Sequence, residues 1–359
     1  MDRLQTADLL ARAAAVDSTV TERTLEFWRH QDLLPRPKRS GQNGKTPLWT
    51  YSPEAGEQLT ALLRLRARTK DPNALRVALW YEGYPISTSR VRSSISAYLR
   101  GIQDACEREL AKRSSEADDP EARWHAIRAV AATLAGKRGK GFPRLSRQAL
   151  SDRIDAIALT LGMVLGDELA TEHLQTDAPA VERLIGVDRG RRFRPHGLRP
   201  WLVAPPAEGL EGFAHFGNLP RLVAVIDNAT EDELEAARNL SAILLGGISA
   251  FSRIADAMIG RDNASGMAGI QMLDGDPHAP LFAVPLVLSV LTSTEMAENL
   301  SQVIRALQNN VLPLEQRVKE MAALPEPERV ERLKKLDQLP FSEQLPIKRL
   351  LAEFESHQG

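Results

Sequence analysis

The segment from Val20 to Tyr51 constrains the fold of this chain more than any other stretch. Thr21 is a residue type that caps helix N-termini, and apolar side chains follow it at helical spacing to about Gln31. Pro35 and Pro37 stop this helix, because proline has no backbone N–H and a fixed φ. The segment therefore predicts a short helix that ends abruptly.

The residues after this helix are of a different kind. Residues 36–47 hold four cations, two glycines and two prolines, and they are predicted to form a loop. Leu48, Trp49 and Tyr51 are typical of a short strand, and Ser52-Pro53-Glu54 is typical of a helix start. A helix followed by a basic wing with some β character is the plan of a winged helix-turn-helix. The fold class predicted for the chain is mainly α, with this module and its small β wing at the N-terminus and a largely helical C-terminal region.

The charge of the chain is unevenly distributed. Residues 1–113 hold 19 Lys and Arg against 13 Asp and Glu, a net +6, whereas residues 114–359 hold 27 against 34, a net −7. A basic N-terminal part on an acidic body is typical of a nucleic-acid reader with a second module. Chance imbalance is the alternative.

Helical patterns continue along the rest of the chain. Asp71-Pro72 begins one helix, Ser87 to Leu110 forms another, and Thr230 to Glu233 is a capping box that opens a long helix to about Ile259. Residues 200–226 are rich in proline and glycine and contain short apolar pieces such as Leu222 to Ile226. For these pieces the sequence does not decide between strand and helix. Further helices are expected at 121–135, 148–175, within 281–311, with a start signal at Thr292 to Glu295, and at 341–356.

Three domains are expected from these patterns: 1–112, a winged helix-turn-helix; 113–200, a helical linker or dimerisation region with basic loops; and 201–359, a helical effector or assembly domain. The single cysteine, Cys106, excludes an intrachain disulfide framework and a cysteine-rich metal site. The apolar run from Ala279 to Leu291 is shorter than the roughly 20 residues that cross a bilayer. With no signal peptide visible, a cytoplasmic protein is expected.

The N-terminal part of the chain, about residues 4–110 and above all residues 20–51, resembles the DNA-binding domain of the MerR family of transcription regulators. VTERTLEFWRHQDLLPRP, which begins at Val20, follows the family's V-S-x-x-T-L-R-Y-Y-E-R-x-G-L-L-x-P-x-R pattern. WTYSPEAGEQLTALLRLR, which begins at Trp49, follows the R-x-Y-S-x-E-D-x-x-x-L-x-x-I-x-x-L-R pattern. Leu75 to Ala97 is similar to the family's next helical pair, so the resemblance covers about 100 of the 359 residues.

The resemblance implies a transcription regulator that binds double-stranded DNA. Its recognition helix would enter the major groove, where exposed N-terminal side chains reach base edges. The basic wing would lie on the flanking backbone, where phosphate contacts make binding salt-dependent. The expected DNA-binding residues are Thr21, Arg23, Thr24, Trp28, Arg29, Arg36, Lys38, Arg39, Lys45 and Tyr51. A solvated basic loop without a ligand is the alternative.

Several positions depart from the family pattern, and each removes a cation, a hydroxyl or a glycine. Glu26 replaces an arginine, Phe27 and Trp28 replace paired tyrosines, Trp49 replaces an arginine, and Asp32 replaces the glycine of the helix stop. Arg23, Arg29 and the wing cations would have to compensate. The operator and the strength of DNA binding therefore do not follow from the resemblance.

The resemblance also implies a homodimer, because a palindromic operator requires one, and a small-molecule or protein effector at the C-terminal region. Ser87 to Leu110 and Leu150 to Leu169 are candidate pairing helices, although neither shows sustained heptads. No cofactor, metal or membrane partner is expected, and no catalytic activity. The alternative function is an excisionase-like or architectural module that acts mainly through protein–protein contacts.

Other motifs are weaker. Asp274-Gly275-Asp276 with His278 misses the calcium-loop spacing and predicts a polar turn, and Gly260 to Gly269 predicts a connector. His196 and His215 are expected to be packing or surface residues. The basic stretches 136–147 and 189–199 fit an extended DNA contact, an acidic partner or a solvated linker, and these readings remain open.

Overall fold

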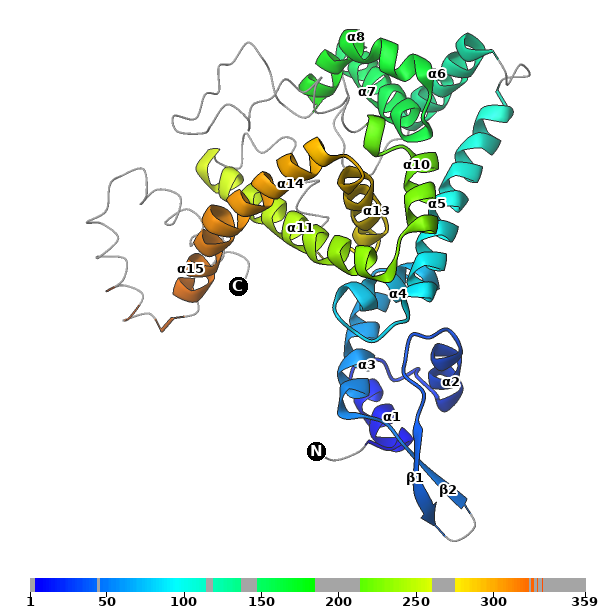
Figure 1. Cartoon of the computed structure of the whole chain (residues 1–359), viewed down its shortest axis with the longest axis vertical. Coiled ribbons are helices and arrows are strands. Elements are labelled where there is room, and N and C mark those ends of the chain that lie inside the picture. The colour runs from blue at the N-terminus through cyan, green and yellow to red at the C-terminus, as the bar shows by residue number, and fades with distance from the viewer. Residues whose placement is uncertain are drawn as a thin grey trace. The chain divides into compact units, whose positions relative to one another are not determined.

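The computed structural model describes residues 4–43, 46–113, 119–136, 147–184, 214–259 and 275–322, together with residues 324, 325, 328 and 331. This part of the chain is mainly helical with one small two-stranded sheet, which confirms the mainly α class (Figure 1). Its elements are α1 (Thr6–Ala14), α2 (Glu22–His30), β1 (Lys38–Asn43), β2 (Thr46–Thr50), α3 (Pro53–Arg66), α4 (Pro72–Tyr81), α5 (Thr88–Ala111), α6 (Pro120–Gly136), α7 (Arg147–Leu165), α8 (Glu168–Leu184), α10 (Leu219–Asn228), α11 (Glu231–Ile259), α13 (Ala279–Leu291), α14 (Thr294–Ala306), a π-helical turn η3 (Leu307–Val311) and α15 (Leu312–Ala322).

The chain forms two compact units that each combine distant parts of the sequence. Unit 1 consists of Met1–Gly101, Val223–Arg238 and Gly275–Leu288. Unit 2 consists of Ile102–Leu222, Asn239–Asp274 and Ser289–Gly359. The division between the units therefore falls inside α5, and two later segments of the chain belong to the N-terminal unit.

The core of unit 1 is built from leucines of its first helices. Leu9, Leu25, Leu59, Leu62 and Leu75 are all fully or almost fully buried. The helices start where capping chemistry predicts: Thr21 caps α2, proline occupies the first turn of α3, and the Asp71 carboxylate accepts from the Asn73 N–H at 2.9 Å. Local capping and helical periodicity together account for these elements.

The small sheet of unit 1 corrects the expectation that residues 36–47 form a loop. Most of this stretch is strand, with β1 pairing antiparallel to β2 from Lys38↔Thr50 to Asn43↔Thr46 and a register shift between Arg39 and Gly41. A bridge between Leu4 and Tyr51 continues the pairing beyond β2. The hairpin projects away from α1, α2 and α3 (Figure 1). Its polar strand lacks the apolar alternation that identifies a half-buried strand in a sequence.

Later segments of the chain bind to α4 and α5 within unit 1. Arg100 and Ser96 of α5 both donate to the carboxylate of Asp227, the latter at 2.6 Å. The guanidinium of Arg238 lies 5.2 Å from the ring centroid of Trp80 on α4, a cation–π distance. The turn just before α13 adds His278, whose ring centroid is 5.8 Å from that of Tyr98. Residues 223–238 and 275–288 are therefore part of this helical body.

The prediction of one helix over 148–175, a stretch that belongs to unit 2, is wrong. The structure has two helices, α7 and α8, with a break at Gly166, where φ is 72°. Glycine adopts this left-handed conformation without the steric cost of a Cβ. The helices pack closely, since a Cβ on Gly162 would lie 2.6 Å from the Cβ of Ala170. The apolar pattern continues through the break, so periodicity alone did not reveal it.

The long helix α11 starts at the predicted capping box. The Thr230 N–H donates to the Glu233 carboxylate at 2.8 Å, and the Glu233 N–H donates to Thr230 Oγ1 at 3.3 Å. Ser293 caps α14 as its start signal predicts. Residues 222–226, left open as a strand, lie in the helix α10.

Two adjacent glycines in α11 predict opposite effects on stability. A Cβ on Gly247 would lie 2.9 Å from the Cβ of Leu307, whereas one on Gly246 meets nothing within 4 Å. Gly246→Ala is expected to raise the free energy of unfolding by about 0.5–1 kcal/mol through helix propensity. Gly247→Ala is expected to lower it by about 1–2 kcal/mol because overpacking exceeds that gain. Urea unfolding of both variants checks this, and stabilisation by both would contradict the close packing of α11 on η3.

Several predicted features lie outside the described residues. They are the basic stretch 189–199 and all of 136–147 except its two end residues, the connector 260–269, His196 and the helix at 341–356. Among the helices that the structure describes, none is long and apolar enough to cross a membrane.

Candidate nucleic-acid interface

Helix α2 is held at its N-terminus by a reciprocal pair of threonines. The Thr24 N–H donates to Thr21 Oγ1, and the Thr21 N–H donates to Thr24 Oγ1, each at 3.3 Å. The two hydroxyls are also 3.0 Å apart. Thr21 and Thr24, both expected to bind DNA, thus have a structural role that requires no ligand.

The outer face of α2 presents a mixed set of side chains. Arg23, Glu26, Phe27 and His30 are exposed, and Phe27 is exposed to 55%. Arg23 forms no ion pair or hydrogen bond with any other described residue. Arg29 is half-buried, and its Nε donates to the Leu25 carbonyl at 3.2 Å. Of the arginines on this helix, Arg23 is therefore the one whose guanidinium is free to meet a ligand.

The C-terminus of α2 is closed by a Schellman motif with an unusual residue. The Leu33 N–H donates to the Trp28 carbonyl at 2.8 Å, and the Asp32 N–H donates to the Arg29 carbonyl at 3.1 Å. Asp32 takes φ 54°, a left-handed conformation that favours glycine. Its carboxylate lies 3.0 Å from Arg90 Nε on α5. Asp32 therefore occupies the position at which the resemblance predicted glycine, and its carboxylate pairs with Arg90.

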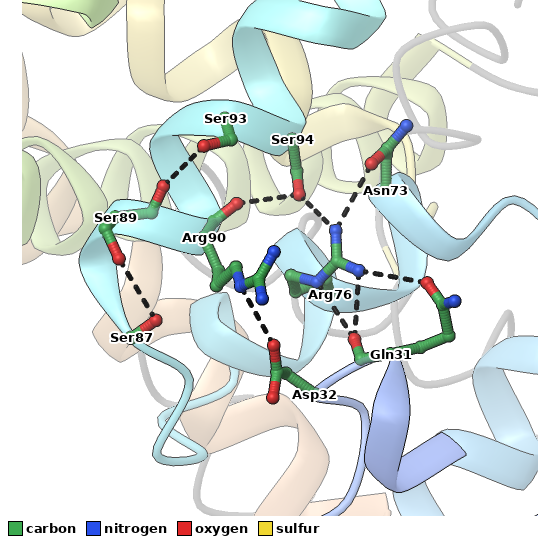
Figure 2. A network of polar contacts seen from close by, with 9 residues as sticks. All are labelled: Gln31, Asp32, Asn73, Arg76, Ser87, Ser89, Arg90, Ser93 and Ser94. Carbon is green, nitrogen blue, oxygen red and sulfur yellow. Dashed lines mark hydrogen bonds and ion pairs between the residues drawn. The ribbon is translucent and has the colours of Figure 1, made fainter. Parts of the chain in front are cut away.

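A buried arginine braces the same end of α2 against α4 and α5 (Figure 2). Arg76 donates to the backbone carbonyl of Gln31 through Nε at 3.1 Å and through Nη2 at 2.9 Å. Its Nη1 donates to Ser94 Oγ at 2.5 Å and to Asn73 Oδ1 at 3.2 Å. Burial lowers the pKa of the Arg76 guanidinium, and the nearby Asp32 carboxylate opposes that shift. Sequence reasoning missed this network, because its members are up to 63 positions apart, from Gln31 to Ser94.

The segment between α2 and β1 is anchored to the core. Leu33 and Leu34 are buried, and the buried amide of Gln58 donates to the Leu33 carbonyl at 3.0 Å. The hairpin therefore begins only a few residues after a fixed point. This anchoring limits how far the hairpin can move relative to α2.

Three cations at the start of the hairpin, Arg36, Lys38 and Arg39, are called the wing cations below. All three side chains are exposed, and none forms an ion pair or a hydrogen bond with another side chain in the described part of the chain. Trp49, the register partner of Arg39 on β2, is exposed to 50%. Lys45, the fourth expected cation of the wing, lies outside the described residues.

Two expected DNA contacts are buried. Trp28 packs in the core, and the Arg66 guanidinium covers its ring at 4.7 Å from the centroid. The Tyr51 side chain is also buried, and its hydroxyl has no hydrogen-bond partner among the described residues. Neither side chain is at the surface in this conformation. Among the described residues of the expected set, Arg23 and the wing cations are the cations with exposed side chains.

The weaker motifs show no metal-binding arrangement in the described residues. No group of three or more His, Cys, Asp and Glu side chains is placed to hold a metal there. Asp276 accepts from the His278 N–H at 2.8 Å, the expected polar turn. Burial raises the pKa of the Cys106 thiol, which disfavours the reactive thiolate.

The chain was compared with protein-family models, with curated proteins and with solved structures. It matches no family model, no curated protein and no solved structure.

Proposed function

We propose that this chain is a sequence-selective, double-stranded DNA-binding transcription regulator of MerR-like type. Helix α2 enters the major groove, and the β1–β2 hairpin lies on the flanking backbone as a wing. This proposal rests on Arg23, which is exposed on a helix fixed at both ends, and on the wing cations that follow it. The side chains of these cations have no partner within the part of the chain that the structure describes. Fixed helix ends hold a side chain in one orientation, which base readout requires.

The chemistry of the two elements suits different parts of DNA. Arginine donates two parallel hydrogen bonds to guanine O6 and N7, so Arg23 is assigned to a base edge. The wing cations are assigned to phosphates, where a point charge is sufficient. Glu22 and Glu26 are exposed on the same helix and repel phosphate. They are better suited to the amino group of cytosine, which a carboxylate can accept from.

The remaining parts of the proposal are the dimer and the effector. A dimer would place two copies of α2 one helical turn of DNA apart. The C-terminal region would modulate binding through α5, because α5 carries both Arg90, which pairs with Asp32, and Arg100, which pairs with Asp227.

A second candidate function is supported by the exposed aromatic side chains. Phe27 is exposed to 55% and Trp49 to 50%. Glu22 and Glu26, which are also exposed, weaken the positive field of α2. Aromatic residues are enriched at protein–protein contacts. An architectural module that binds a protein through α2 and the hairpin would use these features.

Replacing Arg23 separates the two functions. On a duplex enriched from a random pool, Arg23→Ala is expected to weaken binding by about 10-fold or more, the typical value of one bidentate base contact. On a random-sequence duplex the change should be far smaller. Fluorescence anisotropy measures both dissociation constants, and Arg108→Ala, an exposed arginine on α5 in unit 2, is the matched control. Equal, small losses for both variants on both duplexes would favour the protein-binding alternative.

A further inference from the structure

The backbone at the C-terminal end of α2 accepts hydrogen bonds from a buried arginine side chain. One backbone carbonyl, that of Gln31, accepts two hydrogen bonds from the same guanidinium, at 3.1 and 2.9 Å. Arg76 is only 8% exposed, and a charged group is rarely so buried unless it is fully paired. A cation at a helix C-terminus also interacts favourably with the helix dipole. Arg76 therefore binds the end of α2 directly.

The same guanidinium also fixes α4 and α5. Its Nη1 donates to Ser94 Oγ on α5 and to Asn73 Oδ1 within its own helix, and Ser94 Oγ donates in turn to the Arg90 carbonyl at 2.8 Å. Arg90 closes the loop by pairing with Asp32, the residue that follows Gln31. Figure 2 shows the guanidinium of Arg76 at the centre of these contacts. Three helices thus meet at one planar group with a fixed fork geometry.

We propose that Arg76 is a positioning residue for base readout: it sets the orientation of α2 on α4 and α5 and thereby the sequence selectivity of DNA binding. This inference rests on the proposed function. Arg76 is buried, and in this conformation it acts through α2 and not on DNA. Its effect should fall on the base contact of Arg23, whereas the wing cations lie beyond the Gln58-anchored Leu33 and should be unaffected.

The test compares Arg76→Met, Arg76→Lys and Ser94→Ala with the wild-type full chain. Selectivity is the ratio of the dissociation constants for a random duplex and for an enriched duplex at one salt concentration. A partly unfolded protein loses affinity for both duplexes alike, so the ratio does not move with a merely structural defect. Loss of one base contact is expected to reduce the ratio about 10-fold in Arg76→Met and somewhat less in Arg76→Lys. The salt dependence on the random duplex should stay unchanged.

Ser94→Ala keeps the variant test usable if Arg76→Met does not fold. It removes one acceptor of Arg76 and leaves the Gln31 contacts, so a reduction of about 3-fold in the ratio is expected. A folded Arg76→Met variant, or Ser94→Ala in its place, with wild-type selectivity would overturn the proposal.

Hydrogen exchange provides a readout that does not depend on DNA. The amide of Gln31, which donates to the Phe27 carbonyl, and those of Asp32 and Leu33, which close the Schellman motif, should exchange faster in Arg76→Met, while those in the middle of α3 should not. If the wild-type ratio is close to one, the proposed function fails, and exchange at these three amides then decides the positioning role alone. Unchanged exchange there would overturn it.

Discussion

Removing the wing cations should abolish most of the sequence-independent affinity for DNA. The triple variant Arg36→Ala/Lys38→Ala/Arg39→Ala removes three exposed charges that have no partner among the described residues. Each phosphate contact contributes about 0.9 to the slope of log affinity against log salt. Loss of three contacts should make that slope shallower by about 2.7. When salt rises from about 50 to about 200 mM, the factor by which affinity falls should therefore be about 40 times smaller for the triple variant than for the wild type.

The matched control for this variant removes equal charge elsewhere. Arg108→Ala/Lys112→Ala/Arg113→Ala changes three cations at and after the end of α5 in unit 2. Anisotropy titrations on a random duplex at the two salt concentrations give the slope for each protein. If the control flattens the slope as much as the wing variant does, the hairpin is not the part of the chain that contacts phosphate.

Among the variants proposed for this chain to test its stability, Arg123→Met should lower the free energy of unfolding the most. Its Nε is 3.0 Å from Asp167, whose side chain is 3% exposed, and its other two nitrogens donate to Glu107 at 2.9 and 2.8 Å. Arg123→Met keeps the apolar stem but leaves the Asp167 carboxylate buried and unpaired. Breaking a buried pair in this way is expected to lower the free energy of unfolding by about 3 kcal/mol. Urea unfolding followed by circular dichroism measures the loss.

Two controls test the cause of that loss. The double variant Arg123→Met/Asp167→Asn removes the stranded charge and should recover part of the stability. Arg100→Met breaks a pair whose side chains are 57% and 39% exposed, and it should cost less than about 1 kcal/mol. If Arg123→Met is as mild as Arg100→Met, the pairing between Arg123 and Asp167 has little energetic importance.

The Arg123 variant should also change the pH dependence of stability. Hydrogen bonds from Arg123 hold the pKa of Glu107 below its ordinary value of 4.5. A carboxyl whose pKa is lower in the folded state contributes stability above its unfolded pKa and loses it as pH falls through its folded pKa. The difference in stability between wild type and Arg123→Met should therefore narrow as the pH falls below 4.5.

Local chemistry made part of the fold predictable. Thr21, Asp71, Thr230 and Ser293 were recognisable as helix caps because a short polar side chain can accept from the backbone a few residues later. Ser52-Pro53-Glu54 identified the start of α3, whose leucines are buried. These signals depend only on residues close together in the sequence.

Other parts of the fold depend on contacts that a single sequence does not reveal. Strand β1 is held by backbone pairing with β2, so its polar residues carry no periodic signal. The break at Gly166 lies inside an apolar pattern that continues on both sides of it. The short apolar run 222–226 suited a strand or a helix equally, and it forms part of α10.

The exposed cations of the candidate site were predictable from the sequence, but the contacts that hold α2 in place were not. Arg23 and the wing cations follow from charge and position in the sequence. The burial of Trp28 beneath Arg66 depends on how α2 packs against α3, and the bracing of Gln31 by Arg76 joins segments 45 residues apart. The left-handed Asp32 was visible as a departure from the family pattern, but its partner Arg90 was not.

The selectivity of the wild-type chain tests the central claim most directly. Duplexes enriched from a random pool and scrambled versions of the same duplexes are titrated by anisotropy at one salt concentration of about 0.15 M. A sequence-reading protein should bind the enriched duplex at least about 10³-fold more tightly than the scrambled one. Equal affinity for both duplexes would contradict the claim that α2 reads DNA.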